Sequence, residues 1–313
     1  MTNSNDSKPK SLLLIIAGAK GAVGSTVAAA VAAMQKNPDV ILPSLITRNS
    51  FVYLGPPESI FMTGWDAQST TLVDSIKNHG VLTDNLLKPL EKALDKTPIL
   101  PSPPQNLDLK GQVAHLTKDI QDFKKQHADA LPVMINLVPA CTRCNLDQVK
   151  HVDDLYAEVT PENFPDLAYV LAAIISEIPV VNFSPNRLEI PVVVQEAVEQ
   201  RIPISGRDGK TGQTYFKVVL ASALKARSLY VDGWYSLNIL GNADGKNLMD
   251  PDRAAGKVAN KTELLDEILG YFVGEHYEEP THKVHIDYYP PRGDAKEACL
   301  LYTSDAADDE YNV

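Results

Sequence analysis

The chain has 313 residues, of which 44% are hydrophobic and 22% charged, and its formal net charge at pH 7 is −11. This is the composition of a globular protein with room for one large or two ordinary domains. The negative charge argues against nucleic acid or an anionic membrane as the main partner. Three cysteines supply no disulfide framework, the first ten residues lack a signal-peptide core, and the apolar runs are too short to span a bilayer, so we expect a cytoplasmic protein.

Short apolar runs alternate with helical patterns through the first two thirds of the chain. Leu12–Ile16 is typical of a buried strand, and an Ala-rich helix follows at Ser25–Met34 with Ser25 as the expected N-cap. The proline-rich segment Pro98–Gln105 is typical of a surface connection. This alternation indicates an α/β fold with a doubly wound, mostly parallel sheet. Further strands are expected at 40–47, 59–63, 133–138, 180–183 and 203–205, and helices at 166–178 and 191–199.

A glycine turn lies between the first expected strand and its helix. Gly18 permits a tight turn, Gly21 permits close approach of a pyrophosphate, and Gly24 permits close packing of the helix on the strand. Lys20 stands where the stricter fingerprint has its second glycine. The arrangement predicts a Rossmann-type dinucleotide site, with a purely structural turn as the alternative.

The ribose-binding acid of such a site is expected at the end of the second strand. Thr47-Arg48 ends the second expected strand here, so the acid is missing at that place. Asp66, in Gly64-Trp-Asp66, is the substitute that we predict for binding the adenosine ribose. Arg48 leaves NADP as an alternative to NAD.

The pattern changes from Ser228 onward, where strands at 229–237 and 283–289 enclose a helix at 262–271. We therefore predict a disordered N-terminus at 1–10, a Rossmann domain at 11–214 and a second, α+β domain at 215–298. The last fifteen residues, 299–313, resemble a translated sequencing adapter. We expect them to be non-native, with the natural protein continuing past Ala298; a disordered acidic tail is the alternative.

A second glycine-rich run, Gly206–Thr214, leads into a helical pattern at 215–224. Unpaired N–H groups and the helix dipole converge at such a helix start, which suits a phosphate. Gly209-Lys-Thr211 is similar to a P-loop, but Ile204 stands where the first glycine is required, so a nucleoside triphosphatase is excluded. Asn238–Leu248 is a further polar run that local sequence alone assigns to a turn.

Two other clusters are discounted. Cys141-Thr-Arg-Cys144 has no second ligand pair for zinc and no thioredoxin-like context. His282 and His285 lie three apart on an expected strand, so they should point to opposite faces and be surface residues. No metal site is predicted.

The motifs follow one another in the order in which they occur in inositol-3-phosphate synthases, which the chain resembles over about residues 11–298. The resemblance implies an NAD-binding Rossmann domain, an inserted catalytic and oligomerisation domain, and a C-terminal return that this chain does not contain. It also implies a cytoplasmic homotetramer when intact. The motifs are the glycine turn, Gly64–Asp66, Asn182-Phe-Ser-Pro185, Gly206–Thr214, Asn238–Leu248 and Gly293-Asp-Ala-Lys296.

The reaction implied by the resemblance converts glucose 6-phosphate to 1D-myo-inositol 3-phosphate, for inositol and phospholipid biosynthesis. It proceeds by oxidation, enolisation, intramolecular aldol closure and reduction, so NAD is regenerated. The alternatives are an NAD-dependent dehydrogenase of another sugar or polyol phosphate and a non-catalytic NAD-binding paralogue. Because the family draws a further acid and lysine from the missing segment, we expect this chain to turn over poorly or not at all.

The resemblance also assigns residues to roles. Arg207 and Tyr215 depart from the family pattern, in which an acid and a basic residue are common at these positions. The implied catalytic residues are Lys257, Lys261, Lys296, Asp208 and Asp294, and the substrate phosphate would lie on Thr211, Gly212, Gln213 and Thr214. The implied cofactor-binding residues are Gly18, Gly21, Ala22, Val23, Gly24, Asp66, Asn136, Ser184, Asn238, Asn242 and Asp244.

Overall fold

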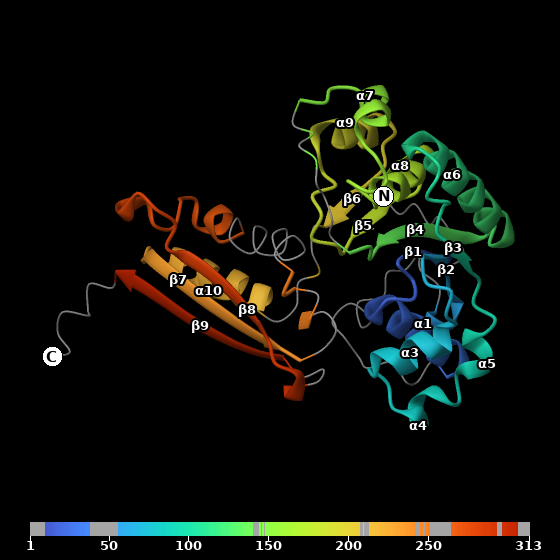
Figure 1. Cartoon of the computed structure of the whole chain (residues 1–313), viewed down its shortest axis with the longest axis horizontal. Coiled ribbons are helices and arrows are strands. Elements are labelled where there is room, and N and C mark those ends of the chain that lie inside the picture. Colours follow the sequence, from blue (N-terminus) through green and yellow to red (C-terminus); the bar gives the residue numbers. More distant parts are fainter. Residues whose placement is uncertain are drawn as a thin grey trace, which may run out of the picture. The chain divides into compact units, whose positions relative to one another are not determined.

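The computed structural model describes residues 10–37, 56–139, 144, 146, 148–206, 209, 213–241, 245–246, 248–250, 264–292 and 296–305. The chain divides into two compact units, Met1–Arg207 and Asp208–Val313 (Figure 1). We call them unit 1 and unit 2. The division lies before helix α10 (Gln213–Ala226), whereas the sequence placed it after Thr214, inside that helix.

Unit 1 contains a six-stranded, fully parallel sheet in the order β3-β2-β1-β4-β5-β6. The strand order reverses between β1 and β4, and it is the order of a dinucleotide-binding Rossmann fold. The predicted α/β, doubly wound fold is therefore confirmed. The strands are β1 (Ser11–Ala17), β2 (Ile60–Asp66), β3 (Ile99–Pro101), β4 (Ala130–Asn136), β5 (Val180–Asn182) and β6 (Ile204–Gly206).

Helices cover both faces of this sheet (Figure 1). Along β1, Leu13 and Ile15 belong to one buried cluster and Ile16 to the other, so the strand is apolar on both sides. The first cluster packs under α6 (Leu109–Gln126), α7 (Val152–Glu158), α8 (Leu167–Ile175) and α9 (Pro191–Glu199). The second packs under α1 (Ala22–Lys36), α3 (Leu72–His79), α4 (Asp84–Leu87) and α5 (Glu91–Leu94), and a short 3-10 turn, η2 (Pro57–Ser59), precedes β2.

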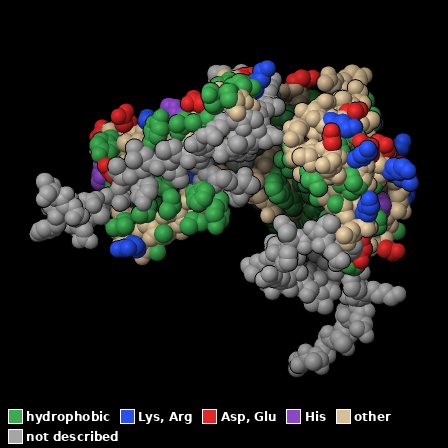
Figure 2. Space-filling model, turned by 90° about the horizontal axis from the view of Figure 1, so that it is seen from below, with side chains coloured by type: hydrophobic (Ala, Val, Ile, Leu, Met, Phe, Trp, Pro, Cys, Tyr) green, Lys and Arg blue, Asp and Glu red, His purple; other side chains and the backbone are tan. Residues whose placement is uncertain are grey.

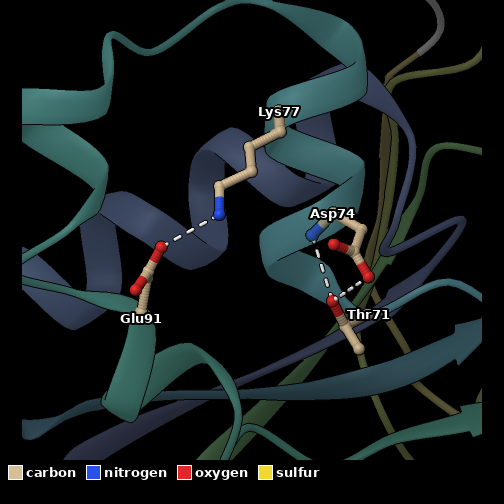
Figure 3. A network of polar contacts seen from close by, with 4 residues as sticks. All are labelled: Thr71, Asp74, Lys77 and Glu91. Atoms are coloured by element: carbon tan, nitrogen blue, oxygen red, sulfur yellow. Dashed lines mark hydrogen bonds and ion pairs between the residues drawn. The ribbon is translucent and has the colours of Figure 1, made fainter.

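Local side-chain chemistry sets the bounds of α3 (Figure 3). The Thr71 hydroxyl accepts the N–H of Asp74 at 3.0 Å and caps the first turn, and Gly80 ends the helix at φ +67°. Lys77 Nζ lies 3.0 Å from Glu91 Oε1, so an exposed ion pair joins α3 to α5. Such surface ion pairs add little to stability, so burial of apolar side chains contributes most of the free energy that holds the two helices together.

Two local expectations for unit 1 were wrong or incomplete. Helix α1 begins at Ala22 with Gly21 as its N-cap, and Ser25 is buried inside the first turn. Pro98–Gln105 includes β3, which tolerates Pro101 because it is an edge strand that needs no proline N–H. The expected strand at 40–47 lies outside the described residues, and among these the neighbour of β1 is β2.

Unit 2 contains a three-stranded sheet in the order β8-β7-β9. Strand β7 (Tyr230–Leu240) pairs parallel with β8 (His282–Tyr288) and antiparallel with β9 (Lys296–Asp305), which confirms the expected long strands. Its buried cluster joins Trp234 and Val231 of β7 to Ala221 of α10 and to Leu265, Leu269 and Val273, where residues 264–269 are helical. Two short 3-10 turns, η3 (Glu275–Tyr277) and η4 (Pro290–Arg292), flank β8.

Residues 299–305 of the segment expected to be non-native lie in β9, where their backbone pairs with β7. The origin of 299–313 stays a prediction. Hydrophobic side chains gather on the visible face of unit 2, while charges of both signs are mixed over unit 1 (Figure 2). Within the described ranges, no helix combines the length and the hydropathy that a membrane span requires.

Candidate functional site

The glycine turn of unit 1 is a tight loop between β1 and α1, at the carboxyl edge of the sheet. The N–H groups of Gly18 and Ala19 both donate to the Trp65 carbonyl, at 3.0 and 3.1 Å, and Gly21 N–H donates to Gly18 O at 3.3 Å. Gly18 has φ +84°, a conformation that favours glycine. The turn is thus anchored to the end of β2 and points the N-terminus of α1 toward the edge where Rossmann folds bind ligands.

The fold itself requires two of the three glycines. A Cβ on Gly24 would lie 2.7 Å from the carbonyl oxygens of Ala19 and Gly18, and one on Gly18 would lie 3.0 Å from Leu137 O. Gly21 differs, because its φ is −63° and the nearest atom to an added Cβ is Gly18 O at 3.4 Å, an ordinary contact. The fold would accept a side chain at Gly21, so the space above it is available to a ligand.

Asp66 ends β2, the strand that is hydrogen-bonded to β1. This is the place where the dinucleotide fingerprint has its acid, so the acid is present after all. Asp66 was predicted for this role from the sequence but only as a substitute, because the second strand was expected at 40–47, outside the described residues. The carboxylate is 7% exposed and accepts the backbone N–H of Lys20 at 2.7 Å and that of Gln68 at 2.8 Å.

Lys20 is held at three points, which explains how the turn tolerates it in place of a glycine. Its N–H donates to Asp66, its Nζ donates to the Gln68 carbonyl at 2.7 Å, and its carbonyl accepts from His79 Nε2 at 3.0 Å. The side chain is therefore drawn along the end of β2 toward Gln68.

A buried amide network lies at the carboxyl ends of β4 and β5. Asn136 Nδ2 donates to Asp166 Oδ2 at 2.7 Å and to Asn182 Oδ1 at 3.1 Å. Asn186 Nδ2 donates to Asp166 Oδ1 at 2.9 Å, and Asn182 Nδ2 donates to the Asn186 carbonyl at 2.8 Å. Ser184 joins the network, since its N–H donates to Asn182 Oδ1 at 3.0 Å and its hydroxyl accepts the Asn186 N–H at 3.3 Å.

Asp166 makes folding stability depend on pH. Burial raises the pKa of its carboxyl from 3.8 to about 6, against the lowering effect of the hydrogen bonds from Asn186 and Asn136. The folded protein holds this proton more tightly than the unfolded chain, so the stabilisation is complete below pH 3.8 and is lost as the pH rises through about 6. Two pKa units correspond to about 3 kcal/mol.

Replacement of Asp166 with asparagine should remove this dependence. We expect the unfolding free energy of Asp166→Asn, relative to the unaltered chain, to rise by up to about 3 kcal/mol between pH 4 and pH 7, because the buried charge is gone. Urea unfolding at several pH values measures the difference. A difference that is constant with pH would show that the carboxyl does not titrate in this range.

In unit 2 the structure describes part of the predicted substrate site. Thr214 is buried in the first turn of α10, which begins at Gln213, so the expected helix start is present. Asn238 lies in β7 with Nδ2 3.5 Å from the His285 carbonyl, and the backbone of Lys296 begins β9 opposite Leu240. The other predicted residues lie outside the described part of the chain: Asp208, Thr211, Gly212, Asn242, Asp244, Lys257, Lys261 and Asp294.

A buried lysine and histidine of unit 2 were not foreseen. Lys217 of α10 is 0% exposed, and its Nζ lies 2.6 Å from Nε2 of His282, which is 5% exposed. The expectation of a surface residue was therefore wrong for His282 and right for His285, which faces the other side of β8. Lys217 lies three positions after Thr214 and four before Ala221, and all three are buried on one face of α10. This helical spacing is the sequence pattern from which the burial of Lys217 could have been predicted.

The structure describes part of the two discounted clusters. No group of three or more metal-binding side chains occurs among the residues that the structure describes. Cys144 is half-buried, and burial raises the pKa of its thiol, which is the opposite of what a reactive cysteine needs. Cys141 lies outside the described residues.

The chain is similar to known proteins over most of its length. A family model described as myo-inositol-1-phosphate synthase matches residues 212–310. Inositol-3-phosphate synthase 1 of Bacteroides thetaiotaomicron is 38% identical over 198 residues, which are 59% of this chain and 45% of that protein. Inositol-3-phosphate synthase of Dictyostelium discoideum is 30% identical over 278 residues, which are 79% of this chain and 53% of that protein.

The fold has a counterpart among solved structures. The crystal structure of inositol-3-phosphate synthase from Caenorhabditis elegans superposes with a TM-score of 0.80 at 21% identity, over 96% of this chain and 69% of that one. At that identity the likeness concerns the fold. The chain spans about half the length of the curated relatives that it matches.

Proposed function

The chain belongs to the inositol-3-phosphate synthase family, and from this premise we propose that it binds NAD and glucose 6-phosphate for synthesis of 1D-myo-inositol 3-phosphate. The observation that carries the proposal is Gly21. The fold does not need a glycine at this N-cap, whereas a pyrophosphate that approaches the start of α1 does.

The geometry of unit 1 fits NAD. The first turn of α1 presents Ala22 and Val23 at the surface, and its backbone N–H groups lie at the positive end of the helix dipole. Each oxygen of Asp66 already accepts one N–H and keeps a further lone pair for a ribose hydroxyl. A carboxylate there repels a 2′-phosphate, which favours NAD over NADP. Bound NAD would accept a hydride from the substrate and return it.

The substrate would lie on unit 2. The start of α10, with Thr214 in its first turn, would hold the phosphate together with Thr211, Gly212, Gln213 and the ammonium of Lys296. Oxidation and enolisation place negative charge on oxygen, which a nearby cation stabilises. The lysines at 257 and 261 would supply it, with Asp208 and Asp294 orienting them, and Asn238, Asn242 and Asp244 would line the site. These roles are carried over from the family resemblance.

Replacement of Gly21 with alanine tests the cofactor site. The added methyl group would occupy the space for the pyrophosphate, so we expect NAD affinity to fall at least about tenfold, whereas the free energy of unfolding should fall by no more than about 1 kcal/mol because alanine is a poorer N-cap than glycine. Calorimetric titration of the chain with NAD measures the affinity. Ala30→Ser is the matched control, because Ala30 is exposed on the same helix away from its N-terminus, and it should bind NAD as the unaltered chain does.

Two results would contradict the proposal. One is a chain that binds no NAD. The other is net accumulation of NADH with glucose 6-phosphate, because a synthase returns the hydride and a dehydrogenase of a sugar or polyol phosphate does not. Absorbance of NADH and phosphorus NMR of the product, recorded on the same reaction, separate the two classes of enzyme.

A further inference from the structure

Asp166 lies directly before α8, and its ionisable carboxyl group is buried, with the residue 0% exposed. Each of its oxygens accepts one amide N–H, Oδ1 from Asn186 and Oδ2 from Asn136. No charged side chain of the described residues is among the causes that shift its pKa. The titratable group beside it is Tyr169, one turn along α8. Burial, followed by the charges of Asp66 and Asp166, raises the pKa of that phenol to about 12, so it stays neutral.

The asparagines that bind Asp166 also hold the two loops at the carboxyl edge of the sheet. Asn136 Oδ1 accepts the N–H of Val138 at 3.1 Å, in the loop after β4. Asn182 Oδ1 accepts the N–H of Ser184, and Asn182 Nδ2 donates to the carbonyl of Asn186, so it closes the loop after β5. The orientation of these amides is therefore part of the shape of the edge.

The loop after β4 is in contact with the glycine turn. Leu137 N–H donates to Ala17 O at 2.9 Å, and a Cβ on Gly18 would lie 3.0 Å from Leu137 O and 3.3 Å from Val138 N. Gly18 therefore rests against the segment that Asn136 holds. A path of direct contacts runs from Asp166 through Asn136 and the 137–138 backbone to the turn.

We propose that Asp166 is a positioning residue of the dinucleotide site, whose ionised carboxylate orients the asparagines that wall the glycine turn, so that its protonation weakens NAD binding. The inference rests on the proposed NAD binding of unit 1. An ionised carboxylate only accepts hydrogen bonds, and both of its amide partners donate. When the carboxyl is protonated, the oxygen that carries the proton becomes a donor and a weaker acceptor, so the amide N–H bonded to it is held less firmly and turning of that amide's oxygen toward the proton is favoured.

Reorientation would disturb the edge. The amide of Asn136 cannot rotate without losing its bonds to Val138 N–H and Asn182 Oδ1. Asn186 is the other partner, and its backbone carbonyl and N–H both bind within the loop after β5. Reorientation of either amide would therefore shift the backbone of a loop at this edge, and reorientation of Asn136 would also shift the backbone that contacts Gly18.

The test is the NAD affinity of the full chain at pH 5 and pH 7. With a pKa of about 6 for Asp166, the ionised fraction at pH 5 is about one tenth, so affinity should be about tenfold weaker than at pH 7. Asparagine imitates the protonated carboxyl, with one acceptor and one donor. Asp166→Asn should therefore bind NAD with the same affinity at both pH values, and more weakly than the unaltered chain does at pH 5. Asp122→Asn, an equal change of charge in an exposed pair with Lys125, should behave as the unaltered chain.

The outcomes separate this inference from the proposed function. Absence of NAD binding at either pH would overturn both. Binding by the unaltered chain, with the same pH dependence in Asp166→Asn, would overturn the positioning role alone. If Asp166→Asn does not fold, Asn186→Ala takes its place: loss of that amide should move the midpoint of affinity against pH upward, and an unmoved midpoint would refute the role.

Discussion

Replacement of Gly64 with alanine is expected to prevent stable folding of unit 1. Gly64 has φ +151°, and a Cβ built on it would lie 2.0 Å from Ile16 O and 2.7 Å from Ile16 N and C. Ile16 is its partner in β1, which β4 holds on the other side, so the strand cannot move away without breaking a second ladder. We expect a loss of at least about 4 kcal/mol, a large part of the total stability of a domain.

Urea unfolding followed by tryptophan fluorescence measures this loss. The two tryptophans lie in different units, so a Trp234→Phe background leaves buried Trp65 to report on unit 1. Gly80→Ala is the matched control: its φ is +67° but an added Cβ meets nothing within 4 Å, so only about 1–2 kcal/mol of backbone strain is expected. Equal losses in the two variants would show that the clash at Ile16 is relieved elsewhere.

The α/β architecture could be predicted from the sequence because most of its strands and helices have a recognisable local pattern of apolar residues. The run at Leu12–Ile16, the glycine turn and the helices at 166–178 and 191–199 are recognisable by periodicity and by turn residues alone. Edge strand β3 could not be recognised in this way, because its three residues include a proline and are too few to show an alternation of apolar and polar side chains. Its pairing with β2 depends on the tertiary contact.

The candidate site was predictable in its backbone and less so in its side chains. Gly21 and Asp66 could be named, yet the role of Asp66 in holding Lys20 required the register of β2 beside β1. Asp166 gave no signal, since an acid before a helix is normally an exposed cap. Only the fold shows that it is buried among asparagines from the ends of β4 and β5.

The buried pair of unit 2 leads to the second large effect. Lys217→Ala should lower the unfolding free energy by about 3 kcal/mol, because it empties the volume of a fully buried side chain and removes the partner at 2.6 Å from His282 Nε2. Lys217→Met fills most of that volume and should cost about half as much. Lys225→Ala is the matched control on the same helix, since Lys225 is exposed and its Nζ donates to the Ile268 carbonyl.

Hydrogen exchange locates the effect. His282 and Trp234 are cross-strand partners, so loss of Lys217 should speed exchange of the amides of β7 and β8 and leave those of β1 and β4 unchanged. Because Thr214 lies one turn before Lys217 on α10, the same variant should also weaken glucose 6-phosphate binding if this helix start holds the phosphate. Unchanged exchange in β7 with unchanged stability would mean that the Lys217 side chain contributes no more to stability than its burial costs.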